Sequence, residues 1–203
     1  MSNELRVGDK MPAFSGKDHD GHAVSERDLM GSSVVFYFYP KDETPGCTEE
    51  ACSFRDSIQS FDKLHALVVG VSPDNNASHK QFMSKYKLPF SLLSDEKKTI
   101  AKAFGVLDAK EQIVRSTFVI NPLGIICWIE KPVNVKGHTE RVLKAVLEHC
   151  KQQIASFDDI ERGYKEFLYK GLDITEDFKK MEDEVLKQFG IEKRSSPRDK
   201  KKK

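Results

Sequence analysis

Hydrophobic residues along the chain form two kinds of pattern, and the first is a short unbroken run. A strand that is buried on both faces of a sheet shows such a run, rich in β-branched and aromatic residues and without alternation. Runs of this kind occupy residues 34–39, 67–71, 116–120 and 125–129. The last two are separated by Asn121-Pro122-Leu123-Gly124, a turn sequence that predicts an antiparallel hairpin.

The second pattern is a stripe of apolar residues spaced three or four positions apart, which is typical of an amphipathic helix. Such stripes predict helices over residues 48–64, 76–86, 96–104 and 139–150. Ser94 and Asp95 are capping candidates for the third of these helices. The first thirty residues are predicted to be irregular with short extended pieces, because Gly and Pro interrupt them. Strands that alternate with helices and end in a hairpin favour an α/β sandwich with a mixed sheet.

The pattern changes after Cys150. Residues 151–192 contain no Pro, three Gly and no strand-like run, and they are predicted to form two helices, 157–169 and 175–189. The last eleven residues hold seven basic side chains and one acid, a charge of +6 that leaves −5 on the preceding 192 residues. We therefore divide the chain into a domain, a helical extension and a basic, disordered tail: 1–150, 151–192 and 193–203.

Composition excludes several classes of protein. No apolar run approaches the roughly 20 residues that span a bilayer, and the first residues lack the apolar stretch of a signal peptide. Four cysteines in 203 residues are too few for a secreted disulfide scaffold. The cysteines and six histidines show no convincing metal-ligand spacing, so no metal is expected. We expect an intracellular, cytoplasmic protein, with the nucleus as the alternative and weak nucleic-acid contact through Lys193–Lys203, because of the basic tail.

The segment after the first predicted strand carries the candidate chemistry. Cys47 lies where a buried strand ends and a helix opens. Unpaired backbone N–H groups and the positive end of the helix dipole stabilise a thiolate at such a position. Thr44 can direct its hydroxyl to the same point, and Pro45 and Gly46 suit the sharp entry into the helix. Cys47 is therefore the candidate nucleophile.

Several ordered motifs in this chain resemble one family. The pattern Pro40-x-x-x-Thr44-x-x-Cys47 is similar to the active-site pattern of peroxiredoxins. The form Thr44-Pro45-Gly46-Cys47-Thr48, with Cys52 five residues on, resembles the PrxQ/bacterioferritin-comigratory-protein subfamily. Residues 89–95 and 104–106 look like later motifs of that subfamily, and Arg115 stands where the family carries its catalytic arginine. The resemblance covers roughly residues 4–150.

The resemblance implies a thioredoxin-like fold with a central mixed sheet flanked by helices. It implies that Cys47 is the peroxidatic cysteine and Cys52 the resolving cysteine, joined in an intramolecular disulfide that a thioredoxin-type protein reduces. The expected function is a thiol peroxidase for hydrogen peroxide and organic hydroperoxides, with no cofactor, as a monomer or weak dimer. Thr44, Arg115 and backbone N–H groups would stabilise the charge that develops as the peroxide bond breaks.

Other interpretations remain open for single residues and for the whole chain. Glu50, one turn after Cys47, either holds Arg115 in an ion pair or is a surface charge. Cys127 is expected in the core, and Cys150 has no partner in the sequence pattern. The alternative function is a redox-fold binding protein whose basic tail tethers it to chromatin or another partner. A general disulfide reductase is less suited, because the chain lacks the Cys-x-x-Cys spacing of thioredoxins.

Helix geometry adds an expectation about the disulfide. Five residues along a helix correspond to about 7.5 Å of rise and about 140° of rotation, which places the Cα atoms of Cys47 and Cys52 about 8.6 Å apart. A disulfide needs Cα atoms within about 7 Å. The helix that begins near Cys47 must therefore unwind before the bond can form.

Overall fold

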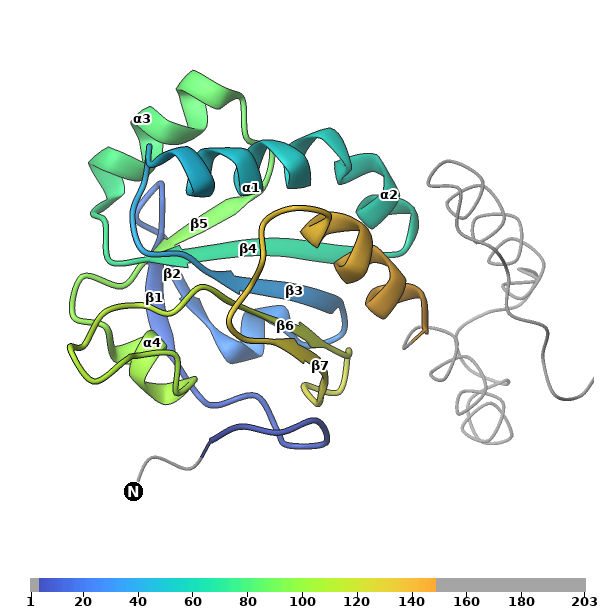
Figure 1. Ribbon diagram of the computed structural model, residues 1–203. Helices are drawn as coiled ribbons and strands as arrows, with labels where there is room; N and C mark the ends of the chain where they lie inside the picture. Colours follow the sequence, from blue (N-terminus) through green and yellow to red (C-terminus); the bar gives the residue numbers. More distant parts are fainter. Residues whose placement is uncertain (1–3, 149–203) are drawn as a thin grey trace, which may run out of the picture. The chain divides into compact units, whose positions relative to one another are not determined.

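The computed structural model of the chain describes residues 4–148, which Figure 1 shows in colour. The chain divides into two units, Met1–Gln153 and Ile154–Lys203, and the described residues belong to the first. Within residues 4–148, no helix has the length and apolar character needed to cross a membrane. Four predicted features lie outside the described residues: the helices at 157–169 and 175–189, Cys150 and the basic tail.

Seven strands among the described residues form one mixed sheet. Their bounds are β1 Ser15–Asp18, β2 Ala23–Ser25, β3 Ser33–Phe38, β4 Ala66–Ser72, β5 Ser91–Ser94, β6 Ser116–Ile120 and β7 Ile126–Glu130. The order across the sheet is β2-β1-β5-β4-β3-β6-β7. β3, β4 and β5 are parallel to one another, whereas β6 and β7 form an antiparallel hairpin beside β3. The predicted mixed sheet and hairpin are confirmed.

The central strand β3 is buried on both faces along its whole length. On one face Phe36 packs against Phe104, with ring centroids 5.0 Å apart. On the other face Tyr37 packs against Phe54, with ring centroids 4.9 Å apart. Because apolar side chains cover both faces, the strand has no polar side to alternate with, and its sequence is an unbroken apolar run.

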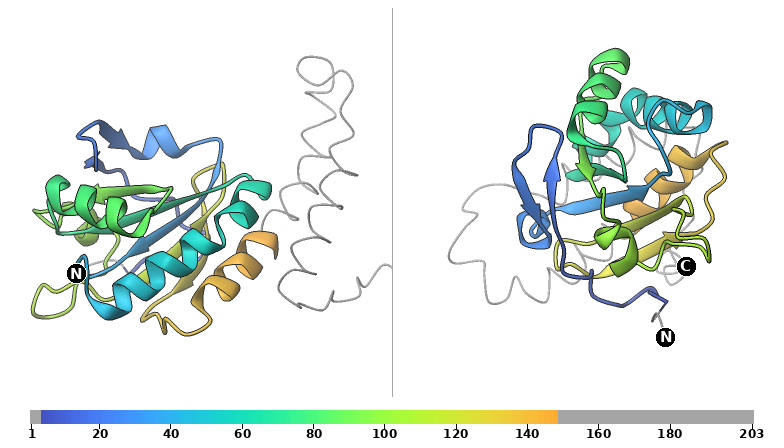
Figure 2. Two further views of the ribbon diagram at one scale, coloured as in Figure 1. Left: turned by 90° about the horizontal axis from the view of Figure 1, so that it is seen from above. Right: turned by 90° about the vertical axis from the view of Figure 1, so that its left-hand side faces the viewer.

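Helices cover both faces of this sheet (Figures 1 and 2). One face carries α1 (Pro45–Asp56), α2 (Ile58–Lys63), α3 (Asn76–Tyr86) and a helix that includes residues 138–148. The opposite face carries the 3-10 helix η1 (Glu26–Leu29) and α4 (Thr99–Ala103). The bounds of α3 are those predicted, and the 138–148 helix begins one residue earlier than predicted.

The single helix predicted over 48–64 is wrong in two respects. The helix begins earlier, at Pro45, and it breaks at Ser57 into α1 and α2. The Ser57 N–H bonds to the carbonyl of Phe54, three residues back, which closes a tight turn in place of a helical one. Phe54 and Phe61 on either side of the break are both buried. The spacing of apolar residues indicates which side chains point toward the core. A short break that keeps the same side chains in the core leaves this spacing unchanged, so the spacing does not predict the break.

The strand β5 and the start of α4 also differ from prediction. β5 is absent from the predicted strands, because its apolar part is only Leu92 and Leu93, too short to distinguish from a loop. The helix predicted over 96–104 begins only at Thr99. The Asp95 carboxylate accepts hydrogen bonds from the backbone N–H groups of Ile100 and Ala101, at 3.1 and 2.8 Å. The helix is therefore shorter than the stripe suggests: Lys98 is its N-cap residue, and Asp95 supplies a side-chain acceptor from three residues earlier.

Candidate active site

The first turn of α1 positions Cys47. Thr44 is the N-cap, and its carbonyl accepts the first helical hydrogen bond from Thr48, at 2.9 Å. Pro45 follows and has no N–H, so the free backbone donors of the first turn belong to Gly46 and Cys47. The Cys47 side chain is only 1% exposed. The sulfur is thus held in a dry position at the positive end of a helix, where a thiolate is stabilised.

Arg115 reaches Cys47 from the neighbouring strand. The register pairs Ser116 at the start of β6 with Phe38 at the end of β3, and this places Arg115 next to the loop that leads into α1. The guanidinium Nη2 donates to the Cys47 sulfur at 3.0 Å. Burial opposes the charge of the guanidinium, but the Glu50 carboxylate and the Cys47 sulfur together raise the pKa of Arg115 above its ordinary value. Arg115 is therefore a cation in contact with the candidate nucleophile.

Glu50 is a buried partner of this arginine and not a surface charge. Its side chain is 1% exposed, and its Oε2 accepts a hydrogen bond from Nη1 of Arg115. Its other oxygen, Oε1, lies 3.1 Å from Nδ1 of His138. The two atoms are not aligned as a hydrogen bond. The side chains of Cys47, Arg115, Glu50 and His138 thus form a chain of contacts that leads inward from the sulfur.

His138 was not among the residues singled out in the sequence. It lies 88 positions after Glu50 and immediately before the predicted helix 139–150, a place where a histidine has no distinctive pattern. Tyr37, below the site, was likewise counted only as part of an apolar run. Burial raises the pKa of Tyr37 well above its ordinary value, and the nearby Glu50, Asp42 and Cys47 raise it further. Tyr37 is therefore a neutral side chain in the core beneath the site.

Three other candidates belong to the loop that leads into α1 or to the first turn of that helix. The Thr44 hydroxyl, expected to point toward Cys47, donates instead to the carbonyl oxygen of Lys41 at 3.2 Å. Gly46 lies beside Arg115, since a Cβ built on it would stand 3.6 Å from the guanidinium. Pro40 is exposed at the start of the loop. These residues shape the loop around the sulfur.

Cys52 lies on the same helix as Cys47 and is a half-buried free thiol. It lies one turn before Arg55, and Asp56 and Cys52 raise the pKa of that guanidinium above its ordinary value, although burial opposes the charge. Cys127, expected in the core, is instead half-buried on the edge strand β7, where its sulfur donates to the carbonyl oxygen of Ile125 at 3.4 Å. Because α1 is helical from Pro45 to Asp56, the reduced form keeps Cys47 and Cys52 too far apart for a disulfide.

A second buried carboxylate fixes the loop that leads into α1. Asp42 accepts hydrogen bonds from the hydroxyls of Tyr39 and Ser78, both at 2.7 Å, and pairs with Nδ1 of His79 at 2.9 Å. Its own N–H donates to Asp74 at 2.8 Å. Burial opposes ionisation of this carboxyl, but the bonds from His79, Ser78 and Tyr39 lower the pKa of Asp42 below its ordinary value. This cluster ties the loop to α3.

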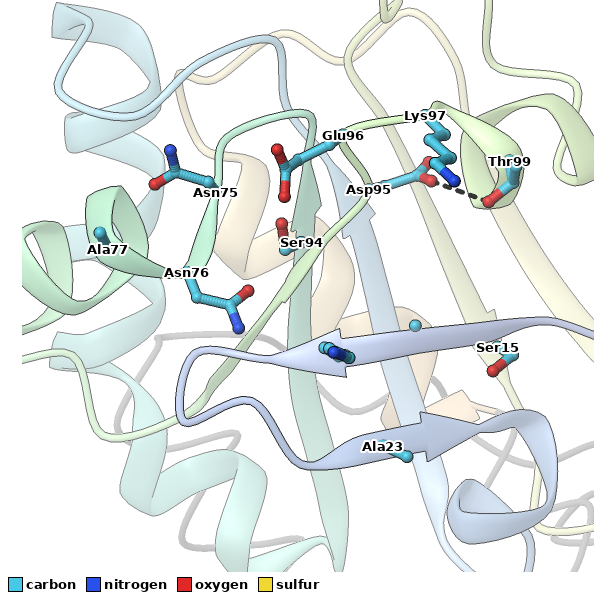
Figure 3. Close-up of a pocket in the computed structure, with 12 residues that line it drawn as sticks. Ser15, Ala23, Asn75, Asn76, Ala77, Ser94, Asp95, Glu96, Lys97 and Thr99 are labelled. Atoms are coloured by element: carbon cyan, nitrogen blue, oxygen red, sulfur yellow. Dashed lines mark hydrogen bonds between the residues drawn. The ribbon is translucent and has the colours of Figure 1, made fainter.

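An open pocket elsewhere on the domain does not include these residues (Figure 3). It has a volume of about 720 Å³ and lies between the β1–β2 hairpin and the starts of α3 and α4. In Figure 3 the Thr99 hydroxyl bonds to Asp95 at its rim. Within residues 4–148, no group of three or more His, Cys, Asp or Glu side chains is arranged to hold a metal ion.

Comparison with known proteins agrees with the geometry. The AhpC/TSA family model matches residues 7–129. The chain is 46% identical over 150 residues to a putative peroxiredoxin bcp of Helicobacter pylori J99, covering 70% of this chain and 99% of that protein. It is 42% identical over 149 residues to peroxiredoxin Bcp of Bacillus subtilis 168, covering 70% and 95%. The structure of Xanthomonas campestris peroxiredoxin Q matches with a TM-score of 0.65 and 36% identity, covering 68% and 91%.

The thioredoxin-like fold and these matches together place the chain in the class of thiol-dependent peroxidases. The chain belongs to the AhpC/TSA family, among its peroxiredoxins of the Bcp and peroxiredoxin Q type. Membership implies peroxide substrates and a thiol reductant. These bacterial relatives lend no support to a nuclear location.

Proposed function

We propose that this protein reduces hydrogen peroxide and small organic hydroperoxides with Cys47 as the peroxidatic cysteine. The contact between Nη2 of Arg115 and the Cys47 sulfur, 3.0 Å long in the first turn of α1, carries the proposal. The thiolate attacks one peroxide oxygen, so that a sulfur–oxygen bond forms while the oxygen–oxygen bond breaks. The sulfur is oxidised to a sulfenic acid, and the departing hydroxide or alkoxide takes a proton and leaves as water or alcohol.

The site stabilises the charge that moves from sulfur to oxygen during this step. Arg115 and the free N–H groups of Gly46 and Cys47 are donors on the side where that charge develops. A single preorganised donor of this kind typically contributes about 2.7–4 kcal/mol to a reaction barrier. Because the Thr44 hydroxyl donates its hydrogen to Lys41, its oxygen is left as an acceptor for the peroxide hydroxyl.

We further propose that Cys52 resolves the sulfenic acid. Its thiol attacks the oxidised sulfur of Cys47, a disulfide forms, and the hydroxyl of the sulfenic acid leaves as water. Since α1 holds both cysteines in one helix, its first turns must unwind for this step. A dithiol protein of the thioredoxin type then reduces the disulfide by thiol exchange and restores the helix.

Peroxide consumption by the full chain tests the assignment. Wild type is compared with Cys47→Ser and Cys52→Ser, each supplied with thioredoxin and its reductase or with glutathione and glutaredoxin. We expect turnover with thioredoxin in wild type, none in Cys47→Ser, and a single turnover with a trapped sulfenic acid in Cys52→Ser. Single-turnover activity in Cys47→Ser would overturn the role of Cys47.

Amide hydrogen exchange tests the unwinding of α1. We expect the amides of residues 47–56 to exchange faster in the disulfide form than in the dithiol form, because each lost backbone hydrogen bond is worth about 1 kcal/mol. The amides of α3 serve as the control within the same sample, since that helix carries neither cysteine. Equal protection of residues 47–56 in the two forms would contradict the proposed resolving step.

A further inference from the structure

His138 occupies an unusual position behind the Arg115–Glu50 pair. It is the first residue of the 138–148 helix and is only 1% exposed. Its Nδ1 lies 3.1 Å from Oε1 of Glu50, and its ring meets that of Phe54 edge-on at 5.4 Å. Neither ring nitrogen of His138 has an aligned hydrogen bond, and neither does Oε1 of Glu50.

Such an arrangement lowers the stability of the fold. A buried polar atom without a hydrogen bond costs about 1–3 kcal/mol, and an apolar side chain beside Phe54 would avoid that cost. This contact links His138 to Glu50, the carboxylate that binds Arg115 beside Cys47. Hydrogen bonds at a reacting site are often poorly aligned before substrate arrives and tighten as charge develops.

The segment that carries His138 is firmly held. Arg141 binds both oxygens of Glu130, at 2.6 and 2.9 Å, and also donates to the carbonyls of Asn134 and Lys136. These bonds close the loop between β7 and the 138–148 helix. At the next residue, Thr139 and Ser53 of α1 share a hydroxyl–hydroxyl hydrogen bond of 2.7 Å. The position of His138 against α1 is therefore determined by contacts other than its own.

We propose that His138 is a positioning residue whose charge, acting through Glu50, sets how strongly Arg115 stabilises the Cys47 thiolate. The proposal rests on the proposed function of Cys47. When His138 carries a proton, it balances the charge of Glu50, and the Arg115 cation is available to the sulfur and the peroxide. When His138 is neutral, Arg115 alone balances Glu50, and less of its charge acts on the sulfur.

The charged groups around His138 favour a positive charge on its imidazole. Glu50 faces it from α1 and Glu130 interacts with it electrostatically from β7. Burial opposes ionisation of Glu130, yet hydrogen bonds from Arg141 and the charge of His138 lower the pKa of Glu130. The two cations nearby, Arg115 and Arg141, are each bound to one of these carboxylates. Histidine is the side chain whose charge ordinarily changes between pH 5 and 8.

The first test is the pH profile of Cys47 oxidation. The second-order rate constant with hydrogen peroxide is measured from pH 5 to 8 on the full chain by rapid quenching and mass spectrometry of the Cys47 peptide. His138→Gln retains a polar side chain that does not titrate. His65→Asn, at an exposed left-handed position where Asn is tolerated, is the matched control.

We expect the wild-type profile to contain one ionisation that His138→Gln lacks and His65→Asn retains. At pH 6 the His138→Gln rate constant should be at least about fivefold lower, the lower end of couplings between linked sites. A His138→Gln profile with the wild-type shape and rate constants would overturn the proposal. A wild type that does not react with peroxide would instead overturn the proposed function of Cys47.

The second test does not require that a His138 variant folds. Because linkage is reciprocal, a charge on His138 that favours the Cys47 thiolate must itself be favoured by that thiolate. The imidazole of His138 is titrated by NMR in wild type and in Cys47→Ser. We expect its titration midpoint to be lower in Cys47→Ser, where the anion is lost. An unchanged midpoint would contradict the proposal whether or not the protein consumes peroxide.

Discussion

Two buried carboxylates lie on either side of Cys47 in the chain, and their surroundings differ. Both oxygens of Asp42 accept well-aligned hydrogen bonds, from Tyr39 on one and from Ser78 and His79 on the other. Glu50 has one oxygen bound to Arg115 and one in a misaligned contact with His138. A saturated carboxylate is suited to holding a loop in one place, whereas an incompletely bonded one can respond to charge at the sulfur.

The largest effect should come from removing the saturated carboxylate. We expect Asp42→Ala to lower the free energy of unfolding by about 3–5 kcal/mol, because it leaves buried His79 and two hydroxyls without their acceptor. Urea denaturation measures this. Asp62→Ala, at an exposed position on α2, is the control and should change the value by less than about 0.5 kcal/mol. If Asp42→Ala and Asp62→Ala lowered the free energy of unfolding equally, Asp42 would not have the structural role that its hydrogen bonds indicate.

Removing the arginine should act on the reaction more than on stability. We expect Arg115→Met to lower the second-order rate constant for Cys47 oxidation about 10²- to 10³-fold, the usual effect of losing one charge-stabilising donor. Arg27→Met, whose side chain is 90% exposed, is the control and should react like wild type. The rate constants of the two variants and wild type are measured by rapid reaction with hydrogen peroxide. A decrease below about fivefold would mean that Arg115 does not act on the sulfur.

A smaller effect on the rate of Cys47 oxidation is expected from Glu50, the carboxylate with incomplete hydrogen bonding. Glu50→Gln keeps the volume and removes the charge, so Arg115 loses its anchor but still faces the sulfur. We expect the same rate constant to fall about tenfold, with a smaller loss of unfolding free energy than Asp42→Ala shows. If Glu50→Gln destabilises the fold as much as Asp42→Ala without slowing Cys47, then the two carboxylates play the same role.

The smallest effect concerns the acid dependence of stability. The folded protein holds the pKa of Asp42 below its ordinary value of 3.8. The stabilisation from this group is therefore fully present above about pH 4 and is lost as the pH falls through the lower, folded pKa. We expect the urea midpoint of Asp42→Asn to fall less steeply between pH 4 and 2 than that of wild type. The difference in slope should correspond to the protonation of one carboxyl group. Identical slopes would show that Asp42 contributes no acid sensitivity.

Local pattern predicted the elements whose information lies within a few residues. The unbroken run of β3, the turn before β7 and the bounds of α3 were all predicted from sequence. The break at Ser57 and the strand β5 were missed, because burial spacing is the same across a short break and a two-residue apolar core resembles a loop. A pattern that indicates which side chains point toward the core does not indicate whether the backbone helix is continuous.

The candidate site divides in the same way. Cys47 in the first turn of a helix was determined by the sequence alone, because strand end, Pro45 and Gly46 act within one turn. Arg115 and Glu50 were candidates in the sequence, but only tertiary structure shows that β6 beside β3 and a buried α1 bring both to the sulfur. His138 was decided by tertiary structure alone, since a contact across 88 residues depends on how two helices pack and leaves no periodic trace in the chain.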